Sequence, residues 1–327
     1  MKVDTITKAY VRDTGVFADI FNYYIYGGRK VILPEQLTER DSTKIALPYG
    51  ADGAVIPVQK FRDVQKLYSE MTDGKMDYIL YGAENQSEVH YAMAVKNNLY
   101  DALEYAGQVE EAAKSHRKEM KRKKEQGESF AGEDGKRPGA GEFLSGFWAE
   151  DKLIPSITVT IFFGSEEWDG PLSLFDMMDI SDPDVLACMD NYHVRLIAPA
   201  RMTDEEIMKF QSSLREVLLF IKYSKDSENL SRILKVNEKR FREVERRAAD
   251  VIEAVTNSGI RYDESKEAVD VCQAIQEIRK ESESKGRLMQ AQESARKLYE
   301  MGIDTERIAQ VVGYALETVT EWLGLEL

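Results

Sequence analysis

The sequence predicts an α/β domain followed by a charged α-helical region. Three observations lead to this prediction. Residues 157–164 (I-T-V-T-I-F-F-G) are an apolar, β-branched and aromatic run of strand length. Residues 16–26 carry apolar side chains at helical spacing. From Thr203 onwards, segments with a helical pattern and many charged residues follow one another.

Size and composition exclude several classes of protein. The chain has 327 residues, 43% of them apolar, so it can build about two domains with a substantial core. Its net charge of −14 rules out nucleic-acid binding through the overall field, and any such contact needs a local basic patch. Cys188 and Cys272 form no C-x-x-C pair, which fits a reducing cytoplasm. We expect a cytoplasmic protein with no membrane segment, because no apolar run approaches about 20 residues.

The first third of the chain predicts a helix followed by strands. The helical pattern of residues 16–26 ends at a Gly-Gly pair, which is typical of a helix C-terminus. Residues 54–58 and 61–68 are expected to be the arms of a strand pair. A turn signal at 73–75 separates them from residues 78–83, a short apolar run that predicts a buried strand.

A helix and then a loop are expected after this strand. Ser87 can cap a helix that keeps its apolar period to about Glu111. Residues 114–124 then contain seven Lys or Arg and one Glu, before a glycine-rich stretch. We interpret 114–142 as a frayed helix end that enters a mobile loop. This basic segment is either a solvated charged loop or an arm that contacts phosphates.

The second half predicts a sheet strand and then helices. Residues 157–164 are apolar on both faces, which favours a central strand, and residues 193–199 predict one more strand. Thr203 begins a T-x-x-E capping box, and a helix is expected to about Tyr223. Two further helices are expected over 230–255 and 264–301.

We therefore divide the chain into three parts. Residues 1–200 are the α/β domain and residues 201–301 are a helical region. Residues 302–327 are two short helices around Gly313, which are either a helix-turn-helix-like tail or a small helical cap.

Few constellations in the sequence can carry chemistry. His90, His116 and His193 lack metal-ligand spacing, and no phosphate-binding glycine motif follows a strand. An acid cluster remains. Glu84 and Gln86 lie two residues apart at a strand end, so they share one face of the strand. Together with the upstream acid Asp63 they could hold a hard cation such as Mg²⁺, although acids at strand ends also occur without any function.

Several segments, in this order, resemble the Rpn family of recombination-promoting nucleases, also described as transposase-like proteins, of the PD-(D/E)XK superfamily. The resemblance spans about residues 8–175 and is looser through the helical tail. The segments that carry it are F-A-D-I-F-N-Y at 17–23, R-D-V at 62–64, Y-I-L-Y-G-A-E-N-Q-S at 78–87, H-Y-A-M-A-V-K-N-N-L-Y-D-A-L-E-Y at 90–105 and I-T-V-T-I-F-F-G-S-E-E-W-D-G-P-L-S-L at 157–174. The resemblance implies a restriction-endonuclease-like core, with a mixed central sheet flanked by helices.

The resemblance also implies roles for individual residues. Asp63 and Glu84 would be the metal-binding acids, with the carbonyl of Asn85 as a further metal ligand. Gln86 stands where the wider superfamily has a lysine, and an uncharged amide can position groups only through hydrogen bonds. Lys96, on the following helix, is either the missing positive charge or a surface lysine.

Asp77 competes with Asp63 for the role of first acid. Seven residues of extended chain place Asp77 more than about 20 Å from Glu84, so Asp63 is preferred.

The function that the resemblance implies is Mg²⁺-dependent hydrolysis of DNA phosphodiester bonds, associated with recombination or transposition. DNA would be the partner, and the cofactor would be Mg²⁺ or another divalent cation. One alternative is a catalytically inactive DNA-binding or regulatory protein on a nuclease scaffold. Another is an interaction protein that forms homo-oligomers through its C-terminal helices.

Overall fold

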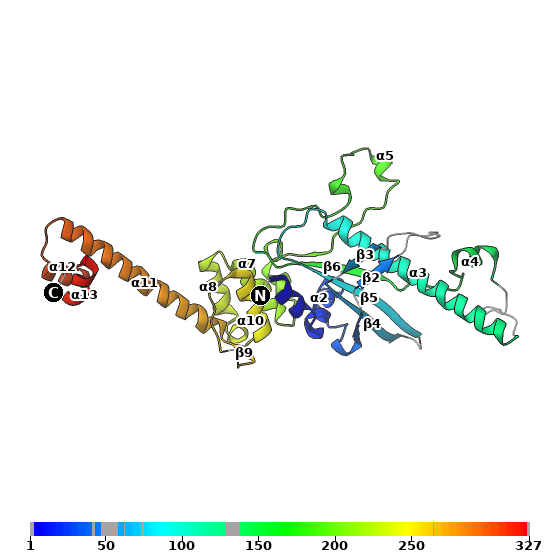
Figure 1. The fold of residues 1–327 in the computed structure, drawn as a ribbon, viewed down its shortest axis with the longest axis horizontal. Helices are drawn as coiled ribbons and strands as arrows, with labels where there is room; N and C mark the ends of the chain where they lie inside the picture. Colours follow the sequence, from blue (N-terminus) through cyan, green and yellow to red (C-terminus); the bar gives the residue numbers. More distant parts are fainter. Residues whose placement is uncertain are drawn as a thin grey trace. The chain divides into compact units, whose positions relative to one another are not determined.

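A computed structural model describes residues 3–40, 43–46, 58–61, 63–72, 75–127, 138–263 and 265–325 (Figure 1). The chain forms two compact units. The first comprises Met1–Ile233 and Arg247–Ser258, and the second comprises Leu234–Arg246 and Gly259–Leu327. The division into 1–200, 201–301 and 302–327 stays a prediction, since compactness alone does not define domains.

A five-stranded sheet lies at the centre of the first unit, in the order β1-β4-β5-β6-β7. β4 is antiparallel to β1 and β5, whereas β5, β6 and β7 run parallel, so the sheet is mixed. The expected α/β fold with a mixed sheet flanked by helices is confirmed at this level. The strands are β1 Leu37–Glu39, β4 Val64–Thr72, β5 Lys75–Gln86, β6 Ser156–Phe162 and β7 Leu196–Ile197, and a separate antiparallel ribbon consists of β2 Thr43–Ala46 and β3 Val58–Phe61.

Helices cover both faces of this sheet. On one face, Phe21 of α2 (Thr14–Tyr26) stacks on Tyr81 of β5, with 4.3 Å between the ring centroids. On the other face, α3 (Met93–Glu125) contacts the sheet through polar side chains such as Glu104. Side chains alternate along β5, so Tyr81 and Glu84 point to opposite faces. The α3 helix therefore connects β5 to the parallel β6 as a crossover.

Most of the remaining elements are short helices. They are α1 Val3–Val11, α4 Ala140–Ser145, α5 Pro183–Leu186, α6 Asp204–Ile207, α7 Leu214–Tyr223, α8 Ser227–Val236, α9 Glu238–Phe241 and α10 Arg246–Thr256. The second unit contains the strand pair β8 Val244–Glu245 and β9 Ala268–Val269, followed by α11 Val271–Glu300, α12 Thr305–Val312 and α13 Leu316–Leu323. No helix of the described residues is long and apolar enough to cross a membrane.

Several sequence expectations are confirmed. The helix over residues 16–26 is α2, and it ends at Gly27 with a φ of 64°, a conformation that favours glycine. The run 157–164 is β6, which has a neighbour on each side. Thr203 caps α6 through the predicted capping box, but the single helix expected to Tyr223 is wrong, because α6 ends at Ile207 and α7 begins at Leu214. The expected pairing of residues 54–58 with 61–68 is wrong, because β3 (Val58–Phe61) pairs with β2, and β4 pairs with β1 and β5. Residues 54–57 and 73–74 lie outside the described residues.

Three further expectations are wrong. Ser87 does not cap α3, which begins six residues later at Met93, because the Ser87 hydroxyl donates to Asp4 instead. The proposed loop 114–142 is helical up to Glu125. Its Lys and Arg side chains are good helix formers that favour a helix C-terminus, and they pair with Glu110 and Glu119.

The third error concerns the helix expected over 230–255. Three short helices and a strand occupy this segment, with the strand Val244–Glu245 between α9 and α10.

The stacked Phe21–Tyr81 pair should carry much of the stability of the first unit. Phe21 is fully buried, so Phe21→Ala should lower the free energy of unfolding by about 3–5 kcal/mol, through lost burial and a cavity. Phe143→Ala is the matched control because Phe143 is 69% exposed, and we expect it to change stability little. Urea unfolding monitored by circular dichroism measures both, and equal effects would contradict this packing.

Candidate functional site

The predicted acids meet where β4 begins and β5 ends. Val64 is the first residue of β4 and pairs with Ala83 of β5. Asp63 comes directly before this pair and Glu84 directly after it, so the antiparallel register brings the two acids to the same edge of the sheet. Asp77 lies opposite Glu70, seven residues before Glu84, and is thus about 23 Å away along the strand.

Glu84 is a buried carboxylate held by one lysine. Its side chain is 1% exposed, and its Oε2 lies 2.9 Å from Nζ of Lys96. A buried charge is costly unless it is paired, so this contact stabilises the ionised carboxylate. Lys96 lies in the first turn of α3, where the helix dipole disfavours a cation, and Glu84 offsets that cost.

Asp63 is held from two sides. Its Oδ2 accepts a hydrogen bond of 2.9 Å from the backbone N–H of Asn85, and its Oδ1 lies 3.7 Å from Nζ of Lys8. Lys8 belongs to α1, one helical turn after Asp4, whose Oδ1 accepts a hydrogen bond from Ser87. One face of α1 therefore reaches the end of β5. Neither α1 residue was predicted, although their i, i+4 spacing places both on one face of a helix.

Asn85 and Gln86 complete this edge of the sheet. Asn85 is 9% exposed, and its side-chain Oδ1 and Nδ2 find no hydrogen-bond partner in the described part of the chain. Such buried, unsatisfied amide atoms are uncommon in folded proteins. Gln86 is half-buried and shares the α3-facing side of β5 with Glu84, as the alternation predicts.

Buried polar contacts fix α3 against β6. The Nδ2 of Asn97 donates to Oγ1 of Thr160, which is the register partner of Glu84. Asp101 accepts hydrogen bonds from Ser156, Thr158 and Tyr192, at 3.0, 2.9 and 2.7 Å. Burial, together with the Asp101 carboxylate, raises the pKa of the Tyr192 hydroxyl, which therefore stays protonated and donates.

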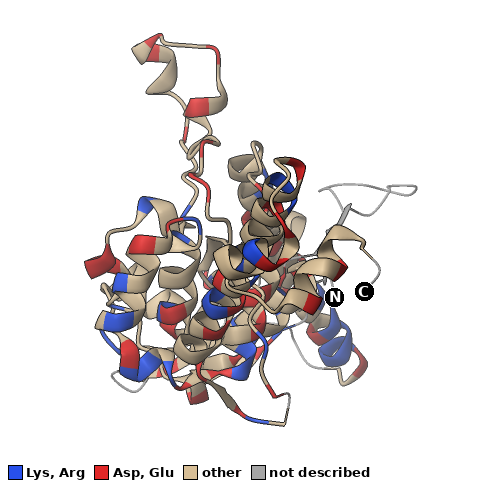
Figure 2. Cartoon of the chain, turned by 90° about the vertical axis from the view of Figure 1, so that its left-hand side faces the viewer, with Lys and Arg blue, Asp and Glu red and all other residues tan. Residues whose placement is uncertain are grey.

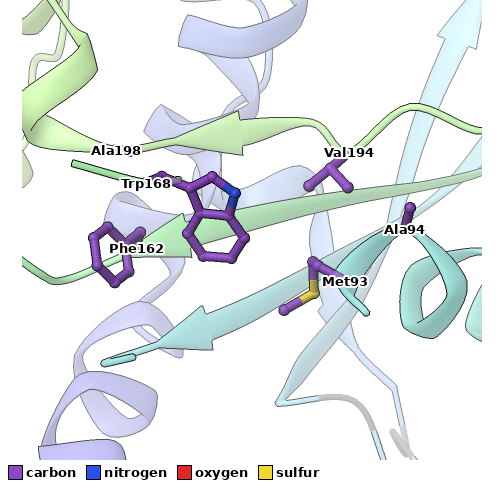
Figure 3. Packing of buried hydrophobic residues seen from close by; sticks show 6 residues of the cluster. All are labelled: Met93, Ala94, Phe162, Trp168, Val194 and Ala198. Carbon is purple, nitrogen blue, oxygen red and sulfur yellow. The ribbon is translucent and has the colours of Figure 1, made fainter. Parts of the chain in front are cut away.

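An apolar cluster holds the first turn of the same helix. Met93 and Ala94 of α3 pack with Phe162, Trp168, Val194 and Ala198 (Figure 3). The rings of Phe162 and Trp168 meet edge to face, with centroids 5.3 Å apart. Because Lys96 follows Ala94 by two residues, this packing fixes its position relative to Glu84.

The donor atoms at this edge suit a hard cation. Two carboxylates and an amide oxygen are ligands that Mg²⁺ accepts, and Mg²⁺ commonly keeps several waters as well. No group of three or more His, Cys, Asp or Glu side chains suited to a metal occurs within the described ranges. A cation here would thus depend on Asp63, Glu84 and Asn85, completed by water.

Comparison with protein-family models, with curated proteins and with solved structures gave no match. The likeness to the Rpn family consequently rests on the sequence motifs alone.

The ion pair of Glu84 and Lys96 should be measurable as a coupling energy. Lys96→Met removes the lysine beside the buried Glu84 carboxylate and should destabilise the protein by roughly 3 kcal/mol. Glu84→Gln should relieve part of that cost, giving a coupling of about 1–3 kcal/mol in a double-mutant cycle by urea unfolding.

The exposed pair of Lys114 and Glu110 on the same helix is the control. Its coupling should not exceed about 0.5 kcal/mol. A coupling at Glu84 and Lys96 as small as that of the control pair would contradict the role of the buried contact.

Proposed function

We propose that this protein is a divalent-cation-dependent deoxyribonuclease that hydrolyses phosphodiester bonds in DNA. The observation that carries the proposal is the pair of acids at one sheet edge, each in contact with a lysine. Acids and cations gathered at a strand end are the groups that phosphoryl chemistry needs, because the scissile phosphate is anionic and gains charge during hydrolysis.

Asp63 and Glu84 would hold the cation, with the carbonyl of Asn85 as a further ligand. The backbone of Asn85 lies beside both acids, because its N–H donates to Asp63 and it directly follows Glu84, and this supports the assignment. When bound, Mg²⁺ would supply charge neutralisation at the phosphate and a more acidic water. The same donors would accept Mn²⁺, so we assign the class of cation and leave the metal open.

The protein groups around the acids have separate tasks. Lys96 lies beside Glu84 and can place its ammonium group against a phosphate oxygen, which offsets the missing superfamily lysine. Gln86, on the same side of the strand, can orient a water molecule through its amide. Lys8 neutralises Asp63 in the absence of a cation and can turn toward the substrate when a cation replaces it.

One observation favours the second candidate, a catalytically inactive DNA-binding protein. Glu84 is already neutralised by Lys96, and Gln86 brings no charge, so the edge could bind a phosphate without cleaving it. The proposed association with recombination or transposition rests on the family resemblance.

Plasmid cleavage tests the proposal. With Mg²⁺ the wild-type protein should nick or linearise supercoiled DNA, and EDTA should stop the reaction. Asp63→Ala and Glu84→Ala should each lower the rate at least about 100-fold, because each removes a charged ligand of the cation.

Asp77→Ala is the matched control, since Asp77 is an acid on the same strand at the opposite end. It should leave cleavage unchanged. Cleavage that persists in both site variants would refute the site, and DNA retention without any cleavage by the wild type would favour the second candidate.

A further inference from the structure

The C-terminal part of α3, residues 114–124, carries an unusual concentration of positive charge and is called the basic segment below. Basic and acidic residues are interspersed over most helices of the chain (Figure 2). Residues 114–124 instead contain seven Lys or Arg and a single Glu. Within the described ranges, no acidic group lies within ion-pairing distance of Lys118, Lys121 or Lys124, and all three are exposed. These ammonium groups are thus available to an anionic partner.

The helical repeat places this charge in line with the candidate site. Lys96 and Lys114 are 18 residues apart, which equals five turns of 3.6 residues, so they lie on one stripe of α3. Lys118 and Lys121 follow Lys114 at i+4 and i+7, within the same stripe. Lys96 is itself 28% exposed beside Glu84, so the stripe begins at the acids and ends in the basic segment.

The distance along this stripe matches one turn of duplex DNA. At about 1.5 Å per residue, Lys114 and Lys121 lie about 27 and 38 Å beyond Lys96. One turn of B-DNA is about 34–36 Å long, and phosphates one turn apart face the same side of the duplex. A protein surface with two cationic points at this spacing can contact one face of a duplex at both.

Residues 146–151 form a compact turn that packs against α3 where the basic segment begins. The His116 ring stacks on Trp148, with centroids 3.5 Å apart, and its Nε2 lies 2.9 Å from Oδ2 of Asp151. Gly146 approaches so closely that a Cβ there would lie 2.5 Å from that of Ala113. These contacts brace α3 where it would otherwise be a single, isolated helix, so the spacing of its charges is maintained.

We infer that the basic segment of α3 binds the backbone of duplex DNA about one helical turn from the bond that is cut, on one side only. This inference rests on the proposed function. It means that the substrate is a duplex that extends at least about one turn beyond the scissile bond in one direction. The contact is with phosphates, so it adds affinity and position but no sequence preference.

A series of short duplexes tests the inference. Starting from a mapped cleavage position, each flank is shortened in turn. The cleavage rate should fall at least about 10-fold when one flank drops below about 10–12 base pairs, and shortening the other flank should have no such effect. The variant Lys118→Gln/Lys121→Gln/Lys124→Gln should cut long and short duplexes at the same low rate.

Binding in EDTA gives a second readout that needs no cleavage. The slope of log affinity against log salt concentration should fall by roughly one for each lysine replaced. The variant Lys280→Gln/Lys285→Gln/Arg287→Gln on α11 is the charge-matched control, since these residues are also exposed, and it should keep the wild-type slope and flank dependence.

The outcomes separate the two proposals. Cleavage by the wild type with equal tolerance of both flanks, or flank dependence that survives the α3 variant, would overturn the inference and leave the proposed function standing. Absence of cleavage would overturn the proposed function. In that case the position relative to a cut bond falls with it, and an unchanged salt slope in the α3 variant would overturn the duplex contact as well.

Discussion

The candidate site depends on how α3 is docked on the sheet. The contact between Lys96 and the buried Glu84 is one of a row of buried polar contacts, which includes Asn97 with Thr160 and Asp101 with Ser156. Polar contacts of this kind fix orientation better than apolar packing, because each donor has one acceptor at one distance. The row therefore sets the rotation of α3 about its axis, and with it the direction of every side chain further along.

The position of the candidate site depends on the register of the strands as much as on the residue types. The pairing of Val64 with Ala83 brings Asp63 and Glu84 to one end of an antiparallel pair, while the parallel β6 places Thr160 beside Glu84. The two acids are far apart in the sequence, and only the pairing of β4 with β5 brings them together. A slip of the register by one residue would turn Glu84 to the other face, so the apolar stacking of Phe21 on Tyr81 also protects the site.

Local patterns in the sequence predicted much of this arrangement. The helix that ends at Gly27, the buried strand of residues 157–164 and the shared face of Glu84 and Gln86 follow from periodicity and turn chemistry. The extension of α3 to Glu125 was missed because the many charges of residues 114–124 were interpreted as a solvated loop. Lysine and arginine are also good helix formers. Lys8 was missed because the i, i+4 spacing places it with Asp4 on one helix face but does not say which strand end that face meets.

The two lysines beside the acids also affect the order in which the chain would fold and bind a cation. An empty site with two bare carboxylates would repel itself and would need its ion in order to fold, as small metal-dependent domains do. Here Lys8 and Lys96 balance Asp63 and Glu84 within the chain itself. Under the proposed function, the fold would not depend on a supply of cations, and a cation could bind after synthesis or together with the nucleic acid.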